Sequence, residues 1–304
     1  MDYQKILDRI EQELRALSLR GKAADYIPAL ANQDLNKFGM AVHTVDGYDY
    51  SVGDADEYFS IQSIAKAFTL SLAMQVYDEK VWERVGKEPS GTRFNSLVQL
   101  EAEEGIPRNP FMNAGALVVT DMITNEPEKM KRELLQFVRK LSGNDDITYD
   151  VSVAQSEKST GYRNVALANF IKSYGNLNNE PEEVLEVYYH QSALSMNCKD
   201  LSRAFIFLAN KGYSPFCEQN ILTLRQSKRM NAILSTSGLY DAAGDFAYRV
   251  GLPGKSGVGG GIMAVIPGQL VVTVWSPGLN TSGNSKIGLQ ALELFTTYTG
   301  ISVF

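Results

Sequence analysis

The sequence predicts a mixed α/β (α+β) domain in which helices flank an antiparallel sheet, and three observations carry this prediction. The stretch KFGMAVHTVDGYDYSVGD alternates apolar and polar residues around Asp46-Gly47, which indicates a β-hairpin. The stretch KSGVGGGIMAVIPGQLVVTVWSP indicates a second hairpin around Pro267-Gly268. Between them, from residue 63 to about residue 227, apolar residues recur three and four positions apart, as in helices. We therefore expect the strands of both ends to form one sheet beside a helical lobe.

The two ends of the chain are predicted to be helices that cover this sheet. The N-terminal stretch MDYQKILDRIEQELRALSLR is amphipathic, with apolar residues along one side: Ile6, Ile10, Leu14 and Leu17. The C-terminal stretch SKIGLQALELFTTYTG has the same period. We expect a single domain over 1–304, with a sheet lobe from 1–60 and 228–304 and a helical lobe from 61–227. A cleft between two lobes is a natural site for a small ligand.

The composition argues against several classes of function. A chain of 304 residues, 44% of them hydrophobic, can bury a sizeable core. A net charge of −6 and a pI of about 5.2, without a basic stripe, argue against nucleic acid or an anionic membrane as partner. The N-terminus lacks the apolar run of a signal peptide, and the longest apolar stretch is broken by Pro-Gly-Gln. We therefore expect a cytoplasmic protein without a membrane span.

Histidine and cysteine are scarce. His43 and His190 have no partner at metal-ligand spacing, so we expect structural or surface roles for both. Cys198 and Cys217 form no close pair and suit a reducing compartment. A Ser-His-Asp triad or a Cys/His metal site would have to draw on these four residues. If the protein is an enzyme acting at neutral pH, its proton carrier is therefore expected to be another side chain.

The stretch FSIQSIAKAF places Ser63 and Lys66 three residues apart at the start of a predicted helix. Residues at this spacing share one helix face, so the lysine amine can lie within reach of the serine hydroxyl. Serine is a weak nucleophile that needs a base, and a lysine becomes one when burial lowers its pKa. A helix start also presents N–H groups to a developing negative charge. The alternative is a plain solvated helix start, although the neighbours of Lys66 are apolar.

A second motif, LPGKSGVGGGIMAV, begins the second strand region. It is not a phosphate loop, because Arg249 stands where that loop requires glycine and a strand pattern follows instead of a helix. Lys255-Ser256-Gly257 is instead a variant of the KTG motif that accompanies SxxK in penicillin-recognising serine enzymes, and it keeps the hydroxyl. The following glycines allow a backbone to approach a ligand closely. The alternative is a glycine-rich bulge in a strand.

Together with these motifs, longer stretches carry a resemblance to a known family. They are ADYIPALA, TVDGYDYSVGD, FSIQSIAKAF, PRNPFMNAGAL, SEKSTGYRNVALA, VLEVYYHQSAL and STSGLYDAAGDFAYRVGLPGKSGVGGGI. The chain resembles the serine-dependent glutaminases over nearly its whole length, without the ankyrin-type extension of some animal members. This resemblance implies a fold like that of serine β-lactamases and transpeptidases. It also implies hydrolysis of L-glutamine to L-glutamate and ammonia through a γ-glutamyl ester, without a metal or organic cofactor, in a homo-oligomer (dimer or tetramer).

The resemblance also implies roles for individual residues. Ser63 would be the nucleophile and Lys66 its base, Tyr240 would transfer protons or donate a hydrogen bond, and the Val258 N–H would complete an oxyanion hole with that of Ser63. Lys255 and Ser256 would support the site from behind. The remaining residues expected around the substrate, together with Ser63, Tyr240 and Val258, are Tyr26, Asn113, Glu157, Asn164 and Tyr188.

The chemistry of these residues suits free glutamine. A carboxylate, Glu157, suits its α-ammonium group, while amides and tyrosine hydroxyls can hold its other polar ends. Each residue has a structural alternative, because Glu157 and Asn164 lie near a predicted helix start and Asn113 could cap the next helix. The tyrosines could simply pack in the core. The alternative functions are a penicillin-binding or esterase-like serine acyl hydrolase, and a non-catalytic protein that binds amino acids.

Overall fold

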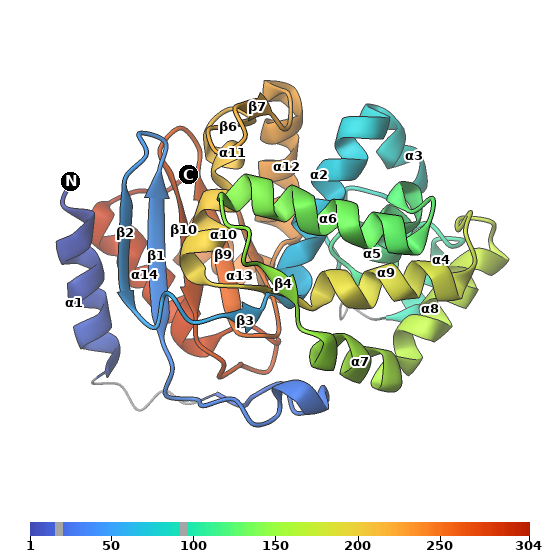
Figure 1. Ribbon diagram of the computed structural model, residues 1–304, viewed down its shortest axis with the longest axis horizontal. Helices are drawn as coiled ribbons and strands as arrows, with labels where there is room; N and C mark the ends of the chain where they lie inside the picture. Colours follow the sequence, from blue (N-terminus) through green and yellow to red (C-terminus); the bar gives the residue numbers. More distant parts are fainter. Residues whose placement is uncertain (16–20, 92–95) are drawn as a thin grey trace.

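A five-stranded antiparallel sheet joins the two ends of the chain (Figure 1). The computed structural model describes residues 1–15, 21–91 and 96–304. The strands lie in the order β2-β1-β10-β9-β8. Their bounds are β1 Gly39–Thr44, β2 Asp49–Gly53, β8 Gly254–Ser256, β9 Gly261–Ile266 and β10 Leu270–Trp275. Both predicted hairpins, β1–β2 and β9–β10, are confirmed. Strand β1 pairs with β10, which joins the two hairpins into one sheet.

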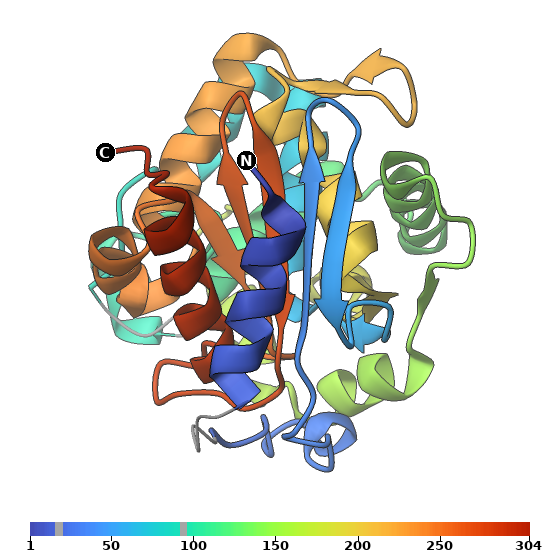
Figure 2. The same ribbon diagram turned by 90° about the vertical axis from the view of Figure 1, so that its left-hand side faces the viewer.

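Helices cover both faces of this sheet, because its central strands are apolar on both sides. Alternate residues of a strand face opposite sides. Val272 packs in the same core as α1 (Tyr3–Arg15) and α14 (Lys286–Thr299), which lie side by side over one face (Figure 2). Its neighbour Val271 instead belongs to the core formed with helices from the middle of the chain. The predicted covering by the two terminal helices is confirmed, while Leu17 lies outside the described residues.

The middle of the chain is mainly helical, as predicted, but the helices Leu224–Ser237 and Ala243–Arg249 continue this region beyond its predicted end at about residue 227. The helices are α2 Ala65–Tyr77, α3 Val81–Arg84, α4 Leu97–Ala102, α5 Asn113–Ile123, α6 Pro127–Ser142, α7 Val151–Thr160, α8 Tyr162–Ser173, α9 Pro181–Ser192, α10 Cys198–Ala204, α11 Ile206–Ala209, α12 Leu224–Ser237 and α13 Ala243–Arg249. Short 3₁₀ turns are η1 Pro28–Leu30, η2 Gln62–Ile64, η3 Asp78–Lys80 and η4 Tyr240–Ala242. None of the helices in the described ranges is both long and apolar enough to cross a membrane. The division into lobes at residues 60/61 and 227/228 stays a prediction.

Five short strands were not predicted, because two or three residues are too few to show an alternating pattern. The strands β3 (Phe59–Ser60), β5 (Leu194–Met196) and β4 (Thr148–Tyr149) form a small sheet in the order β3-β5-β4. The strands β6 (Tyr213–Ser214) and β7 (Gln219–Asn220) form a hairpin. The first sheet matters for the site, because β3 leads directly into the turn that contains Ser63.

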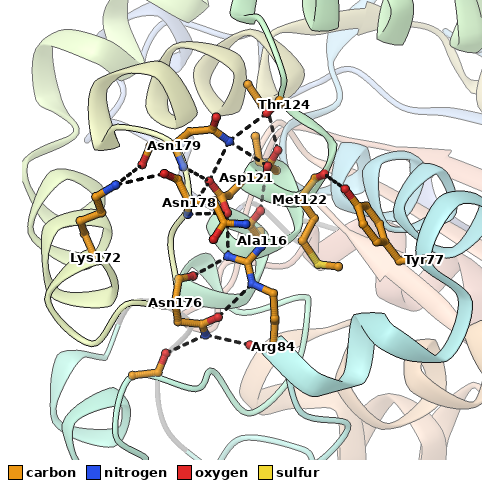
Figure 3. Close-up of polar contacts among 12 residues, drawn as sticks. Tyr77, Arg84, Ala116, Asp121, Met122, Thr124, Lys172, Asn176, Asn178 and Asn179 are labelled. Carbon is orange, nitrogen blue, oxygen red and sulfur yellow. Dashed lines mark hydrogen bonds and ion pairs between the residues drawn. The ribbon is translucent and has the colours of Figure 1, made fainter.

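A buried carboxylate links helices α3 and α5 to the connection between α8 and α9 (Figure 3). The side chain of Asp121 in α5 has no exposed area and forms a 2.6 Å ion pair with Arg84 of α3. It also accepts hydrogen bonds from the backbone N–H groups of Asn178 and Asn179, in the connection between α8 and α9. A buried charge is tolerated when it is paired and its remaining lone pairs accept hydrogen bonds. This cluster therefore holds α3 and the connection between α8 and α9 against α5.

Candidate active site

Ser63 is held at a sharp turn between β3 and α2. The backbone enters the turn through a 2.9 Å hydrogen bond from the Ile61 N–H to the Leu194 carbonyl. The next residue, Gln62, has a φ of +52°, which is rare for a residue other than glycine and costs on the order of 1–3 kcal/mol. Ser63 follows in the 3₁₀ turn η2, and its half-buried side chain faces a cavity. The strained turn thus presents the hydroxyl at the start of α2.

This cavity, which we call the catalytic cavity, has a volume of about 500 Å³. The structure brings all of the residues expected to surround the substrate into its wall: Tyr26, Ser63, Asn113, Glu157, Asn164, Tyr188, Tyr240 and Val258. They come from segments distributed over more than 200 residues of the chain. Most are partly or fully buried, but Tyr26 has an exposed fraction of 56% and lies where the cavity meets solvent.

Lys66 is one of the most buried lysines that the structure describes, with an exposed fraction of 2%. Burial lowers the pKa of its amine to about 7, although the nearby Glu157 carboxylate acts in the opposite direction. The Nζ atom donates hydrogen bonds to the Phe111 carbonyl at 3.2 Å and to Asn113 Oδ1 at 2.7 Å. No hydrogen bond from Lys66 to Ser63 is present among the described residues. The solvated-face alternative for Lys66 is therefore wrong, and its amine can lose a proton near neutral pH.

Asn113 connects Lys66 to the other side of the cavity. Its Nδ2 atom donates a 2.9 Å hydrogen bond to Asn164 Oδ1. Because its Oδ1 atom accepts from Lys66, the orientation of the Asn113 amide is determined by these two partners. The alternative that Asn113 caps α5 is wrong, because Asn113 is the first residue within the helix and its side chain bonds to Lys66 and Asn164. Asn164 lies in the first turn of α8, but its side chain accepts from Asn113 across the cavity wall.

Glu157 lies in the last turn of α7, not near a helix start as expected. The helix ends at Thr160, and the next residue is glycine because a Cβ atom at Gly161 would lie 2.3 Å from the Tyr189 hydroxyl oxygen. Burial raises the pKa of Glu157 to about 7, while Lys66 and a hydrogen bond from Gln62 favour the ionised form. The carboxylate therefore faces the cavity as a group that can gain or lose its proton near neutral pH.

The Tyr240 hydroxyl hydrogen-bonds with the Ser63 side chain and lies 3.4 Å from the Ser256 carbonyl, to which it donates. Burial raises the pKa of Tyr240 to about 12, so the phenol stays protonated at neutral pH. Its backbone φ of +58° is a second strained conformation in the wall of the cavity. Burial also raises the pKa of Tyr188, whose ring lies 5.9 Å from Lys66 Nζ.

The end of β8 approaches the Ser63 turn closely because Gly257 has no side chain. A Cβ atom at Gly257 would lie 2.3 Å from the Ile61 carbonyl oxygen and 3.2 Å from the Ser63 nitrogen. This approach puts Val258, the next residue, into the wall of the catalytic cavity. Its N–H donates no hydrogen bond to another described residue, so this donor is available to a ligand.

Lys255 is fully buried behind this strand end. Its Nζ atom donates 2.8 Å hydrogen bonds to the carbonyls of Gly238 and Ser256. It also lies 4.3 Å from the centre of the Tyr240 ring. Burial and the charge of Lys66 lower the pKa of Lys255 well below its ordinary value. Lys255 thus joins the segment that precedes Tyr240 to the strand that precedes Val258.

Seven residues of the cavity wall were not predicted: Ile27, Gln62, Thr160, Gly161, Tyr162, Arg163 and Ser192. Gln62 hydrogen-bonds to Glu157 and donates a 3.0 Å hydrogen bond to the Ser60 hydroxyl. No periodicity distinguishes a glutamine before a serine from an ordinary polar residue. Its left-handed backbone conformation is also not readable from the sequence.

Comparisons of the sequence and of the structure with known proteins all point to the same family. Residues 21–304 match the family model described as "Glutaminase". A glutaminase of Christiangramia forsetii is 54% identical over 304 residues, covering 100% of both chains. A glutaminase of Agrobacterium fabrum is 56% identical over 305 residues, covering 100% of this chain and 99% of that protein. Among solved structures, the probable glutaminase ybaS has a TM-score of 0.94 at 36% identity, covering 99% of this chain and 97% of its own. The probable glutaminase of Bacillus subtilis has a TM-score of 0.90 at 31% identity, with the same coverage.

Proposed function

The chain belongs to the glutaminase family, and from this premise we propose that it hydrolyses L-glutamine to L-glutamate and ammonia through an acyl-enzyme on Ser63. The observation that carries this mechanism is a half-buried serine in a cavity of about 500 Å³, three residues before a buried amine. Because the pKa of that amine is about 7, about half of it is neutral at pH 7 and can accept the serine proton.

Lys66 is a better base than Tyr240, even though Tyr240 already contacts Ser63. A phenol with a pKa of about 12 is ionised in only about 1 molecule in 10⁵ at pH 7. Lys66 therefore takes the Ser63 proton as the oxygen attacks the side-chain amide carbon of glutamine. To do so, the amine turns from Asn113 towards Ser63 in the reactive complex, as catalytic hydrogen bonds commonly form only with substrate bound.

The negative charge that develops on the amide oxygen is held by the backbone N–H groups of Val258 and Ser63. Such donors act where charge appears in the transition state, so each contributes about 10²–10³-fold to the rate. The proton on Lys66 passes to the leaving nitrogen. The Tyr240 hydroxyl, between Ser63 and that nitrogen, relays it. Ammonia departs, and Lys66 then takes a proton from the water that attacks the ester carbon and returns it to Ser63 Oγ as the ester bond breaks. Lys255 and Ser256 keep these groups in position from behind.

The amino-acid end of glutamine is held on the other side of the cavity. The Glu157 carboxylate binds the α-ammonium group, and this contact further favours the ionised form of Glu157. The amides of Asn113 and Asn164 and the hydroxyls of Tyr26 and Tyr188 hold the α-carboxylate and the rest of the polar end. This anchoring selects for side-chain length, because the amide carbon of asparagine stops about 1.5 Å short of Ser63, and such a misplacement costs on the order of 10²-fold.

We also propose that the protein works as a homo-oligomer in the cytoplasm. Two free cysteines support a reducing compartment. The exposed apolar side chains of Leu97, Val98 and Ile106 would be removed from water if this part of the surface were buried against a second copy. Light scattering on the purified protein tests the subunit number, and a monomer at micromolar concentration contradicts the proposal.

The experiment that tests the activity is a coupled ammonia assay with glutamine and asparagine side by side. We expect kcat/KM for glutamine to exceed that for asparagine by at least about 10²-fold. The Ser63→Ala variant should release no ammonia while still binding glutamate. Ammonia release by Ser63→Ala near the wild-type rate excludes Ser63 as nucleophile. Turnover of a chromogenic β-lactam in place of glutamine points to the penicillin-recognising alternative.

A further inference from the structure

A second, larger cavity of about 820 Å³ adjoins the catalytic cavity. We call it the outer cavity, and its wall consists mainly of residues 21–26 and 279–283, with Arg163, Asp241 and Lys286. The two segments are tied together by backbone hydrogen bonds, from the Lys22 N–H to the Leu279 carbonyl at 3.1 Å and in the reverse direction at 2.8 Å. Glutamine does not need this space, because the catalytic cavity alone has the volume of a small-ligand site.

The outer cavity lies next to the groups that act on the scissile amide. It shares Tyr26 and Arg163 with the catalytic cavity. Asp241 follows directly after Tyr240 in the 3₁₀ turn η4. A Cβ atom at Gly283 would lie 3.6 Å from Cγ1 of Val258. A group attached to the amide nitrogen of a γ-glutamyl substrate would therefore leave the catalytic cavity towards the outer one.

The wall of the outer cavity carries charges of both signs. Lys22 and Lys286 are exposed cations, and Asp25 and Asp241 are exposed anions. None of these four side chains makes an ion pair or hydrogen bond with another residue in the part of the chain that the structure describes. The lysines can pair with a carboxylate, and the aspartates can pair with an amine. A free amino acid carries both of these groups.

We propose that the outer cavity is a leaving-group subsite, and that the enzyme also hydrolyses γ-L-glutamyl dipeptides, in which an amino acid replaces ammonia as the leaving amine. This inference rests on the proposed function, since it uses the same Ser63 acyl-enzyme. The bond between the γ-carbonyl carbon and the nitrogen of the second amino acid breaks as the bond to Ser63 Oγ forms. The serine proton goes to the departing nitrogen. Water then hydrolyses the ester, so the products are glutamate and the free amino acid.

The test compares two substrates that differ by one charge, γ-L-glutamyl-glycine and γ-L-glutamyl-glycinamide, with L-glutamine as reference. Release of glutamate is measured for the wild-type chain and for Lys22→Gln and Lys286→Gln. We expect the wild-type protein to cleave γ-L-glutamyl-glycine with a kcat/KM about two- to fivefold above that of the glycinamide, the effect of one exposed ion pair. Each lysine variant should lose most of this preference and keep its activity on glutamine.

Lys228→Gln is the matched control, because Lys228 is an exposed lysine outside the walls of both cavities. It should preserve the preference for γ-L-glutamyl-glycine. Calorimetric titration of the Ser63→Ala variant with the same two dipeptides gives a binding measurement without turnover, and tighter binding of γ-L-glutamyl-glycine is expected.

The outcomes separate this inference from the proposed function. Cleavage of glutamine without detectable cleavage of γ-L-glutamyl-glycine overturns the leaving-group subsite alone. Equal cleavage of the two dipeptides, unchanged in both lysine variants, also overturns it. If neither glutamine nor the dipeptides are cleaved, the proposed function and this inference are both wrong.

Discussion

The Nζ atom of Lys66 donates a 2.7 Å hydrogen bond to Oδ1 of Asn113, a residue 47 positions later in the chain. The amide oxygen is a neutral acceptor, so it satisfies the buried amine without supplying a negative charge that would keep it protonated. Replacing the Asn113 amide by a carboxylate, as in Asn113→Asp, would add a negative charge with almost no change in the shape of the side chain. The pair therefore offers a direct test of Lys66 as the base.

Asn113→Asp should shift the pH dependence of kcat/KM. A carboxylate beside Lys66 favours the ammonium form and raises its pKa above the value of about 7. We expect the acidic limb of the profile to move to higher pH by at least about one unit, with activity at pH 7 reduced by about fivefold or more. Asn113→Ala removes the acceptor without adding a charge, so it should not move the limb upwards. An unshifted limb in Asn113→Asp would exclude Lys66 as the titrating base.

Lys66→Met should abolish activity and raise stability. The folded-state pKa of Lys66 is lowered, so the unfolded chain binds more protons and the amine destabilises the fold at pH 7. Methionine of similar length removes that cost, which is on the order of 2–4 kcal/mol, less the loss of the hydrogen bond to Asn113. Thermal unfolding should show a Tm raised by about 2 °C or more. The gain should disappear as pH rises towards 10, and a lower Tm at pH 7 would contradict this account.

Glu157→Gln should weaken substrate binding more than it slows chemistry. The variant loses the charge that pairs with the α-ammonium group, so KM should rise by about 10-fold or more. Glu186→Gln is the control, because Glu186 is a partly exposed carboxylate outside both cavities. Steady-state kinetics on glutamine check both variants. An unchanged KM and kcat in Glu157→Gln would remove this residue from the site.

Gly257→Ala should lower kcat with little effect on KM. Its Cβ atom would lie 2.3 Å from the Ile61 carbonyl oxygen, so the end of β8 must move away from the Ser63 turn. A displacement of about 1 Å at an oxyanion hole costs on the order of 10²-fold. Gly244→Ala, in α13, meets no atom within 4 Å and should be active and equally or slightly more stable. Normal kcat in a folded Gly257→Ala protein would show that this approach is unimportant.

Asp121→Ala should strongly destabilise the protein. It leaves the Arg84 guanidinium and two backbone N–H groups without their buried acceptor (Figure 3), and breaking a buried pair costs about 3–5 kcal/mol. Asp245→Ala removes a partner of the exposed ion pair with Arg249 and should change stability by less than about 1 kcal/mol. Urea unfolding measures both variants. Equal effects of the two substitutions would contradict the importance of the Asp121 cluster.

The sequence by itself determined the features that depend on neighbouring residues. Both hairpins follow from alternation around a turn, and the terminal helices follow from a 3.6-residue period, because these patterns record which side of an element is buried. The SxxK motif at Ser63 and the KSG motif at Lys255 were also readable, because each consists of residues close together in the sequence. The residues expected in the catalytic cavity were instead implied by the resemblance to a family. Their presence in one wall agrees with that resemblance, while their individual roles remain proposals.

Only the tertiary structure decided how these residues interact. Glu157 lies in the last turn of α7, and Tyr189 of α9 leaves room only for glycine at position 161, directly after that helix. Lys66 bonds to Asn113 across a wide gap in sequence, and the low pKa of its amine comes from burial by several segments at once. The left-handed conformation of Gln62 holds only because the surrounding fold compensates for its strain. Hydrogen-bond partners and burial depend on residues far apart in the chain, and no local pattern records them.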